Sequence, residues 1–424
     1  MKKIITSLMV LTALAMPLFA SGTSESKAKD DSAVTINFPT FLIGVNSSAD
    51  WMAERAKTFN TTYAGKYKVE IEEIPGDQNY IDKMKVLYSS NSLPDVMYTG
   101  GYNLLDMMEN KFVDLTPYVN ADPDWKATMS KEGINVNSRN GKLLGIPFTK
   151  QEIGYFYNKD LFKKAGITSP ATTWDEFFTQ CDKLKAAGIT PVSMDTADSG
   201  WVTSLMLCAM IANNDAGTKF MNTSLPTDYN TPEFITAASN IQKLFMNYTT
   251  LDAVGGKYEN AASNFFMGQT AIIANGPWMI SNFYDDTMVE PGFAEKVGTA
   301  KFPGDTMYNS GKIGFSICAK TDEKIEASLA FVKFLTSEES QRLMLEVTSE
   351  TPDNPNATSK NVKELVNETI KNAASAKHSI NDFQSLWYAN VVDEISVQYP
   401  LLAKGKISAE EFASILSAKA KENL

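Results

Sequence analysis

The sequence predicts an α/β protein with large hydrophobic cores. Short runs rich in β-branched and aromatic residues alternate with amphipathic runs of helix length. Strands separated by helices favour right-handed crossovers and a largely parallel sheet. The chain has 424 residues, of which 43% are hydrophobic, which suits two or more folded domains. Disordered chains, collagen-like repeats and disulfide-dense miniproteins do not have this composition.

The first elements follow one another in strand and helix order. Strands are expected at 34–38, 68–74, 95–98 and 153–157, helices from about 49 and from about 80 to 88, and a turn with a short strand at 141–147. Each strand run is short and bounded by turn or helix signals. This opening therefore predicts an α/β unit.

Capping signals mark helix starts in the later part of the chain. Thr173 and Glu176 form a capping box, in which the hydroxyl accepts an amide hydrogen and the Glu side chain returns to the cap amide. Gly188 is expected to end that helix. Further signals are capping pairs at Thr336…Glu339 and Ser408…Glu411, Pro232 at a first helical position, and strand candidates at 270–275 and 312–319.

The chain shows no internal repeat, no low-complexity linker and no clean boundary between consecutive domains. The middle and the C-terminal third are more helical than the beginning. Two domains that the chain visits more than once would account for this pattern.

The N-terminus has the pattern of a secretory signal peptide over residues 1–20. A positive start is followed by a mostly apolar run from Ile4 to Phe19 and by the small residues Ala20, Ser21 and Gly22. The run is short for a membrane span and contains Pro17. We expect export, cleavage after Ala20 or Gly22, and a flexible leader over 21–31. No cysteine follows the apolar run, so a lipid anchor is not expected.

The charged residues exclude several functions. There are 39 Lys and Arg against 50 Asp and Glu, a net charge of −11. Only three of the basic residues are Arg (Arg55, Arg139 and Arg342), so a nucleic-acid partner is not expected. The single His378 disfavours a catalytic triad or a multi-histidine metal site.

Sequence motifs of enzymes are also absent. The chain has no GxxxxGK[ST], GxGxxG, HExxH or GxSxG run and no EF-hand loop. We therefore expect no cofactor, no metal and no catalysis. The three cysteines, Cys181, Cys208 and Cys318, are widely spaced and are expected to be buried side chains. A disulfide between Cys181 and Cys208 remains open, because sequence gives no distance.

Three tryptophans stand in settings that suit a sugar. A sugar ring has apolar C–H faces and a rim of hydroxyls, so proteins bind it with aromatic faces flanked by polar side chains. Trp201 follows a polar loop and opens a helix, Trp278 follows Gly276 at the end of a strand, and Trp387 lies in a mixed aromatic and polar run. On pattern alone, each is more often a core residue than a ligand platform.

At these residues the chain resembles the extracellular solute-binding proteins of carbohydrate ABC importers, the family that includes maltose-binding protein. The likeness lies in an ordered set of short motifs at 93–96, 145–148, 157–166, 173–177, 266–278 and 330–335. Each motif alone is weak, and the ordered set covers nearly all of the chain after the signal peptide.

The resemblance implies a two-lobed periplasmic-binding-protein fold with a multi-stranded hinge and a ligand cleft between the lobes. Lobe one would comprise 32–149 and a return segment at 301–336. Lobe two would comprise 150–300 and the C-terminal helices at 337–424. One hinge crossing would lie at 150–152, and closure around ligand would be a hinge motion.

The resemblance also implies where the ligand would bind. The family's stacking aromatics correspond to Trp201, Trp278 and Trp387, and its polar positions fall at or near Gln151 and Asp198. The family often has an acidic residue at the hinge position where this chain has Gln151. From lobe one, loops at strand ends are expected to contribute, because open α/β sheets bind ligands beyond their strand ends; these candidates are Asn46, Asp77 and Tyr102.

The function implied by the resemblance is a monomeric periplasmic receptor that captures a sugar or oligosaccharide and delivers it to ABC permease subunits. The same architecture serves other solutes, including glycerol-phosphate esters and polyamines, and these remain alternatives. A secreted carbohydrate-active enzyme would need a raised-pKa acid opposite a second carboxylate. No pattern in the sequence indicates that pair.

Overall fold

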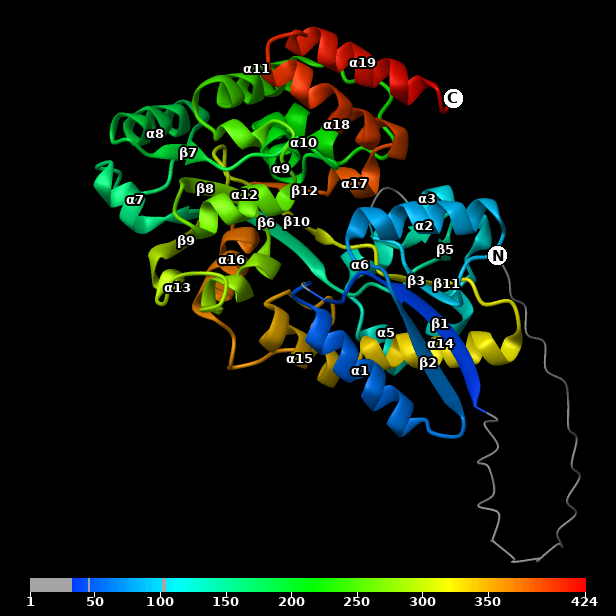
Figure 1. Ribbon diagram of the computed structural model, residues 1–424. Coiled ribbons are helices and arrows are strands. Elements are labelled where there is room, and N and C mark those ends of the chain that lie inside the picture. The colour runs from blue at the N-terminus through cyan, green and yellow to red at the C-terminus, as the bar shows by residue number, and fades with distance from the viewer. Residues whose placement is uncertain (1–32, 45, 101–103) are drawn as a thin grey trace, which may run out of the picture.

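The computed structural model describes residues 33–44, 46–100 and 104–424. It has two α/β lobes joined by extended segments, among them β6 and β10 (Figure 1). The predicted signal peptide, the predicted leader and Tyr102 lie outside the described residues. The family resemblance predicted this two-lobed architecture.

Lobe one is built on four short strands that come from both ends of its sequence. Strand β1 pairs in parallel with β2 from Val34 opposite Tyr67 onward, and β3 pairs antiparallel with β11. The strands are β1 (Val34–Thr40), β2 (Tyr67–Glu73), β3 (Val96–Tyr98) and β11 (Phe315–Ile317), with a small hairpin of β4 (Ser138–Arg139) and β5 (Lys142–Leu143). The parallel pair joined through a helix confirms the α/β prediction for the start of the chain.

Helices surround these strands (Figure 1), and apolar residues of the helices and strands form one buried cluster. Phe38 of β1 contacts the rings of Phe315 and Phe331 at centroid distances of 5.8 and 5.5 Å, which joins the sheet to a later helix. The helices of lobe one are α1 (Ala49–Thr62), α2 (Asp77–Ser89), α3 (Leu104–Met107), η1 (Glu109–Lys111), α4 (Thr116–Ala121), α5 (Pro123–Ala127), α6 (Lys131–Val136), α14 (Asp322–Leu335) and α15 (Glu338–Thr348).

Lobe two has a larger sheet, in which β6 is the longest strand. The order is β12-β10-β6-β8-β7, with β9 also paired to β6. One half of β6 pairs antiparallel with β10, and the other half pairs antiparallel with β8 and β9. The strands are β6 (Lys150–Asn158), β7 (Thr190–Val192), β8 (Thr270–Asn275), β9 (Val297–Ala300), β10 (Thr306–Gly311) and β12 (His378–Ile380).

The helices of lobe two pack on this sheet and on one another. Helix α9 is the most deeply placed, since all of its residues from Val202 to Ile211 are buried. The helices are α7 (Lys159–Lys164), α8 (Trp174–Ala186), α9 (Trp201–Ile211), α10 (Asp215–Met221), α11 (Pro232–Asn247), η2 (Leu251–Ala253), α12 (Tyr258–Phe266), η3 (Pro277–Met279), η4 (Ser281–Tyr284), α13 (Phe293–Lys296), α16 (Glu364–Ala374), α17 (Phe383–Leu386), α18 (Ala389–Ala403) and α19 (Ala409–Lys421).

Two of the predicted capping pairs are present, and one is wrong. Thr173 caps α8 and Ser408 caps α19, each with the reciprocal Glu bond of a capping box. The pair at Thr336 does not form, because Ser337 is the N-cap of α15 and accepts a hydrogen bond from the backbone amide of Ser340. The Thr336 hydroxyl instead donates to the carbonyl of Val332 at the end of α14.

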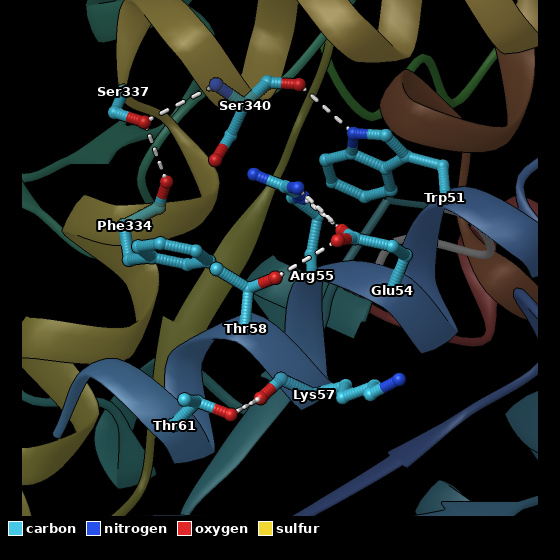
Figure 2. Close-up of polar contacts among 9 residues, drawn as sticks. All are labelled: Trp51, Glu54, Arg55, Lys57, Thr58, Thr61, Phe334, Ser337 and Ser340. Carbon is cyan, nitrogen blue, oxygen red and sulfur yellow. Dashed lines mark hydrogen bonds and ion pairs between the residues drawn. The ribbon is translucent and has the colours of Figure 1, made fainter. Parts of the chain in front are cut away.

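Helix α15 packs on lobe one, which corrects the predicted end of the return segment. The Nε1 of Trp51 on α1 donates to the carbonyl of Ser340 on α15 at 2.8 Å, and the guanidinium carbon of Arg55 lies 5.7 Å from the ring centroid of Phe334 (Figure 2). The predicted start at 301 is also too early, because β10 belongs to the sheet of lobe two. The chain therefore enters lobe one after Gly311 and leaves it after α15.

All three cysteines are buried free thiols, and burial raises the pKa of each one. Within the described ranges, no helix has the length and apolar character needed to cross a membrane. The same part of the chain contains no group of three or more His, Cys, Asp or Glu side chains that could hold a metal ion.

Candidate functional site

Three chain segments cross between the lobes side by side. The backbone amide of Lys150 donates to the carbonyl of Thr351 at 2.8 Å, and that of Lys312 donates to the carbonyl of Thr149 at 3.2 Å. Gln151 lies in the part of β6 that pairs with β10. The side chains of these segments are thus held at the junction of the lobes by backbone hydrogen bonds.

Strand β6 carries a buried carboxamide and a buried carboxylate at the junction. Gln151 is 1% exposed, and its Nε2 has no hydrogen-bond partner of good geometry among the described residues. The carboxamide faces the carboxylate of Asp382, which is 4% exposed. Glu152 accepts a hydrogen bond from the Thr351 hydroxyl at 2.7 Å, and burial raises its pKa. Because buried donors are normally paired, Gln151 is a candidate donor to a ligand.

Lys312 places an ammonium group between aromatic and acidic side chains. Its Nζ lies 5.6 Å from the ring centroid of Trp278 and 5.9 Å from that of Tyr98. Burial alone would lower the pKa of Lys312, but Tyr98, Glu350 and Asp382 raise the pKa above its ordinary value. The lysine therefore stays protonated, and its charge is attracted to the nearby indole.

Two carboxylates from distant parts of the chain balance this cation. Asp382 caps α17 by accepting the backbone amide of Gln384 at 3.1 Å. Burial raises the pKa of Asp382, although the Gln384 amide and Lys312 act to lower it. Glu350, beside the third crossing segment, accepts the hydroxyl of Ser48 from lobe one at 2.9 Å. The junction thus offers charged donors and acceptors within one cluster.

Trp201 and Trp278 lie side by side next to this cluster. Trp278 is in the turn η3 after β8, and Trp201 is the first residue of α9. Their ring centroids are 6.1 Å apart with an angle of 46° between the planes, and both side chains are half-buried. A Cβ at Gly276 would lie 2.2 Å from Cζ3 of Trp278, so glycine is required for this indole position.

Trp387 does not lie with the other two tryptophans. It is 0% exposed, and its ring contacts Phe220, Tyr229 and Phe383. Phe383 in turn contacts Trp201 at a centroid distance of 5.9 Å. The expectation that Trp387 stacks on a ligand is corrected on this geometry, because core aromatics cover its indole. Its place is behind Phe383, as a support for Trp201.

Carboxylates from both lobes lie close enough to interact electrostatically. Asp77 opens α2 in lobe one, while Asp198 lies in the loop before α9 in lobe two. The Asp77 carboxyl is open to solvent, yet partial desolvation and the neighbouring Asp198 and Glu259 raise its pKa. Asp198 has a left-handed backbone with φ of 50°, and its carboxylate lies 3.6 Å from Nζ of Lys257. Asp77 of lobe one therefore faces acidic side chains of lobe two, one of which is paired with Lys257.

The other lobe-one candidate within the described residues has a local role. The Oδ1 of Asn46 accepts the backbone amide of Ser48 at 2.9 Å. This bond shapes the turn before α1 and so helps place the Ser48 hydroxyl that reaches Glu350. This bond uses only the Oδ1 of Asn46, so a contact of Asn46 with a ligand stays a prediction.

Four junction side chains were missing from the sequence candidates. Tyr98 ends β3, a strand that the sequence predicted, so the strand-end rule could have selected it. Lys312 follows β10, which the sequence did not predict as a strand. Asp382 and Glu350 follow no such rule, since they reach the junction only through the fold. The missed residues are Tyr98, Lys312, Glu350 and Asp382.

Comparison with known families identifies the class of protein to which this junction belongs. Residues 54–373 match the family described as bacterial extracellular solute-binding protein. The chain belongs to this family. The match confirms the resemblance that the ordered motifs of the sequence predicted.

Named relatives of this solute-binding protein support the assignment. The multiple sugar-binding protein of Streptococcus mutans is 27% identical over 293 residues, 64% of each chain, so the match spans less than two thirds of that relative. The arabinooligosaccharide-binding protein of Bacillus subtilis is 24% identical over 353 residues, 80% of this chain and 77% of the relative. The solved structure of a chitin oligosaccharide binding protein superposes with a TM-score of 0.84 at 19% identity, over 92% of this chain and 99% of that one. The superposition confirms the two-lobed fold.

Proposed function

We propose that this protein is the receptor of an ABC importer, which captures a sugar or oligosaccharide between its lobes and delivers it to a membrane permease. The observation that carries the proposal is the pair of half-buried indoles, Trp201 and Trp278, beside the Lys312 cluster. A pyranose ring needs an apolar face and several hydrogen-bond partners, and this arrangement supplies both. The sugar ligands named for two relatives support the same ligand class.

Five side chains of the junction contact the ligand in this proposal. Trp278 and Trp201 stack on sugar faces. Lys312 and the Nε2 of Gln151, which faces Asp382, donate hydrogen bonds to sugar oxygens. Asp382 accepts from sugar hydroxyls. The ligand stabilises the closed arrangement of the lobes because it contacts both of them.

Asp77 and Asp198 give the ligand a further part in closure. These carboxylates come from different lobes, and the charge of Asp198 adds to the desolvation that raises the pKa of Asp77. Hydroxyl groups of a sugar placed between them would donate to both carboxylates. Binding therefore offsets a repulsion that opposes closure of the empty protein.

The proposal includes no chemical reaction. Lys312 is protonated and so cannot act as a base. His378 lies in lobe two with its Nδ1 2.9 Å from the Thr218 hydroxyl. Solute-binding proteins of this family bind and release their ligand, which supports a receptor.

We also propose that the chain is exported through a signal peptide at residues 1–20 and acts as a monomer in the periplasm. The family description places its members outside the cell membrane. The scarcity of Arg and the net charge of −11 favour neutral ligands over phosphorylated ones.

Thermal-shift measurements against a panel of ligands test the proposal. The protein lacking residues 1–20 should show a concentration-dependent rise in Tm with one class of mono- or oligosaccharide, because a ligand that binds only the native state stabilises it. A flat response to all sugars, with a rise for a glycerol phosphodiester or a polyamine, would contradict the sugar assignment. Chromatography of the oligosaccharides after incubation should show no cleavage, and new products would identify an enzyme instead.

A further inference from the structure

The loop between β7 and α9 folds around one buried carboxylate, that of Asp195. This side chain is 0% exposed. The backbone amide of Val202 donates to its Oδ2 at 3.3 Å, and that of Thr203 donates to its Oδ1 at 3.1 Å. The Thr203 hydroxyl also donates to the backbone carbonyl of Asp195 at 2.6 Å. Asp195 therefore satisfies two of the free amides at the start of α9 and lies at the positive end of its dipole.

The loop that these bonds close is strained and firmly held. Asp198 and Gly200 both have left-handed backbones, with φ of 50° and 53°. The backbone amide of Gly255 donates to the hydroxyl of Thr196 at 2.7 Å, which ties the loop to the segment before α12. A left-handed non-glycine residue persists only where its surroundings hold it. The position of Asp198 thus depends on the bonds made by the rest of the loop.

The positions of both site candidates in this region, Asp198 and Trp201, depend on the hydrogen bonds that Asp195 makes across the loop. Asp198 lies inside the loop, and Trp201 directly precedes the amides that Asp195 accepts. We propose that the Asp195 carboxylate is a positioning residue, which holds Trp201 and Asp198 for ligand binding, and that protonation of this carboxylate weakens binding. This inference rests on the proposed function for its effect on a sugar, whereas the positioning itself needs no ligand.

The surroundings of Asp195 bring its ionisation close to neutral pH. Burial raises the pKa of Asp195 to about 7, against the lowering effect of the Thr203 and Val202 amides, and Asp198 raises it further. Two other titratable groups face it, Tyr258 of α12 and Tyr399 of α18, and burial raises the pKa of each hydroxyl. Neither tyrosine is charged near neutral pH, so neither changes its charge in the range where Asp195 ionises.

Protonation changes what the carboxyl can do for α9. The ionised group offers acceptor oxygens to the amides of Val202 and Thr203. In the protonated group one oxygen carries a hydrogen. This hydrogen faces an amide hydrogen, so the oxygen no longer accepts that amide well. The first turn of α9 then loses one charge-assisted bond. Ligand affinity should therefore fall by about tenfold as the pH drops through about 7.

Fluorine NMR of protein labelled with 5-fluorotryptophan tests the positioning without ligand. The Trp201 resonance, assigned by Trp201→Phe, should shift between about pH 5.5 and 8.5 with a midpoint near 7. Asp195→Asn should abolish this shift. The control is Asp353→Asn, because Asp353 is also a buried carboxylate that accepts a backbone amide, that of Ser130 at 2.8 Å. This control should keep the wild-type titration.

Calorimetry with the sugar found by thermal shift tests the effect on binding. The wild-type protein should lose about tenfold in affinity below the midpoint, and Asp195→Asn should bind with this lower affinity at every pH. A Trp201 resonance that does not titrate in the wild-type protein overturns the inference, even if Asp195→Asn does not fold. An unchanged titration in Asp195→Asn also overturns it. If the resonance titrates as expected and no sugar binds, the proposed function fails and the positioning role stands.

Discussion

Replacing Trp278 with alanine should weaken sugar binding by about 2 kcal/mol, which is about 30-fold in Kd. The indole is half-buried, so a ligand can cover only its exposed part. That part is roughly 60 Å² of a side chain that buries about 150–250 Å² in full, and the sugar face loses a similar area. At about 25 cal/mol per Å² the two areas contribute about 3 kcal/mol. The cost of ordering the ligand reduces the net effect to about 2 kcal/mol.

Isothermal titration calorimetry with the sugar that gives the largest thermal shift measures this effect. The control is Tyr118→Ala, which removes a 40% exposed aromatic ring from α4 of lobe one. It should leave Kd unchanged, and Trp278→Phe should lose less affinity than Trp278→Ala. A Trp278→Ala protein that melts cooperatively and binds with the wild-type Kd would refute the stacking role of Trp278.

Three further predictions concern charge. Lys312→Met leaves Asp382 without its cation and should weaken binding at least about tenfold, and an unchanged Kd in calorimetry would remove Lys312 from the site. Asp393→Asn removes the carboxylate of α18 that lies 3.5 Å from Nζ of Lys85 on α2. Fluorescence energy transfer between the lobes should show a shift toward the open state worth less than about 1 kcal/mol. The absence of a shift at low salt would contradict this prediction. As pH rises from about 4 to about 7, the unfolding free energy of the wild-type protein relative to Asp195→Asn should fall. The reason is that the Asp195 carboxyl releases its proton near 3.8 in the unfolded chain and near pH 7 in the folded one. Denaturation curves in which the two unfolding free energies differ by the same amount at every pH would oppose this.

Much of the secondary structure could be predicted from local sequence patterns. The capping box at Thr173 and the first-turn proline at Pro232 are both present, because these signals act between residues a few positions apart. The predicted capping pair at Thr336 is wrong, because the neighbouring Ser337 is an equally good N-cap and takes that position in α15. The lobe boundaries were predicted poorly from the sequence, because the packing of α15 on α1 joins residues that are distant in sequence.

The candidate site was only partly predictable. Trp201 and Trp278 could be selected because Trp201 begins a helix after a loop and Trp278 lies in a helical turn after a strand, where side chains reach a sheet edge. Trp387 has a similar sequence setting, but its position four residues after Phe383 is the spacing of a helical core pair. Lys312 was missed because its partners lie far along the chain. Only the crossing of three separate segments brings them together.

A crystal structure of the protein with the sugar found by thermal shift tests the central claim most directly. We expect a pyranose ring stacked on the face of Trp278, with sugar oxygens within hydrogen-bond distance of Lys312 and Gln151. A sugar bound away from the junction of the lobes, or at the junction without contact to Trp278 or Trp201, would contradict it.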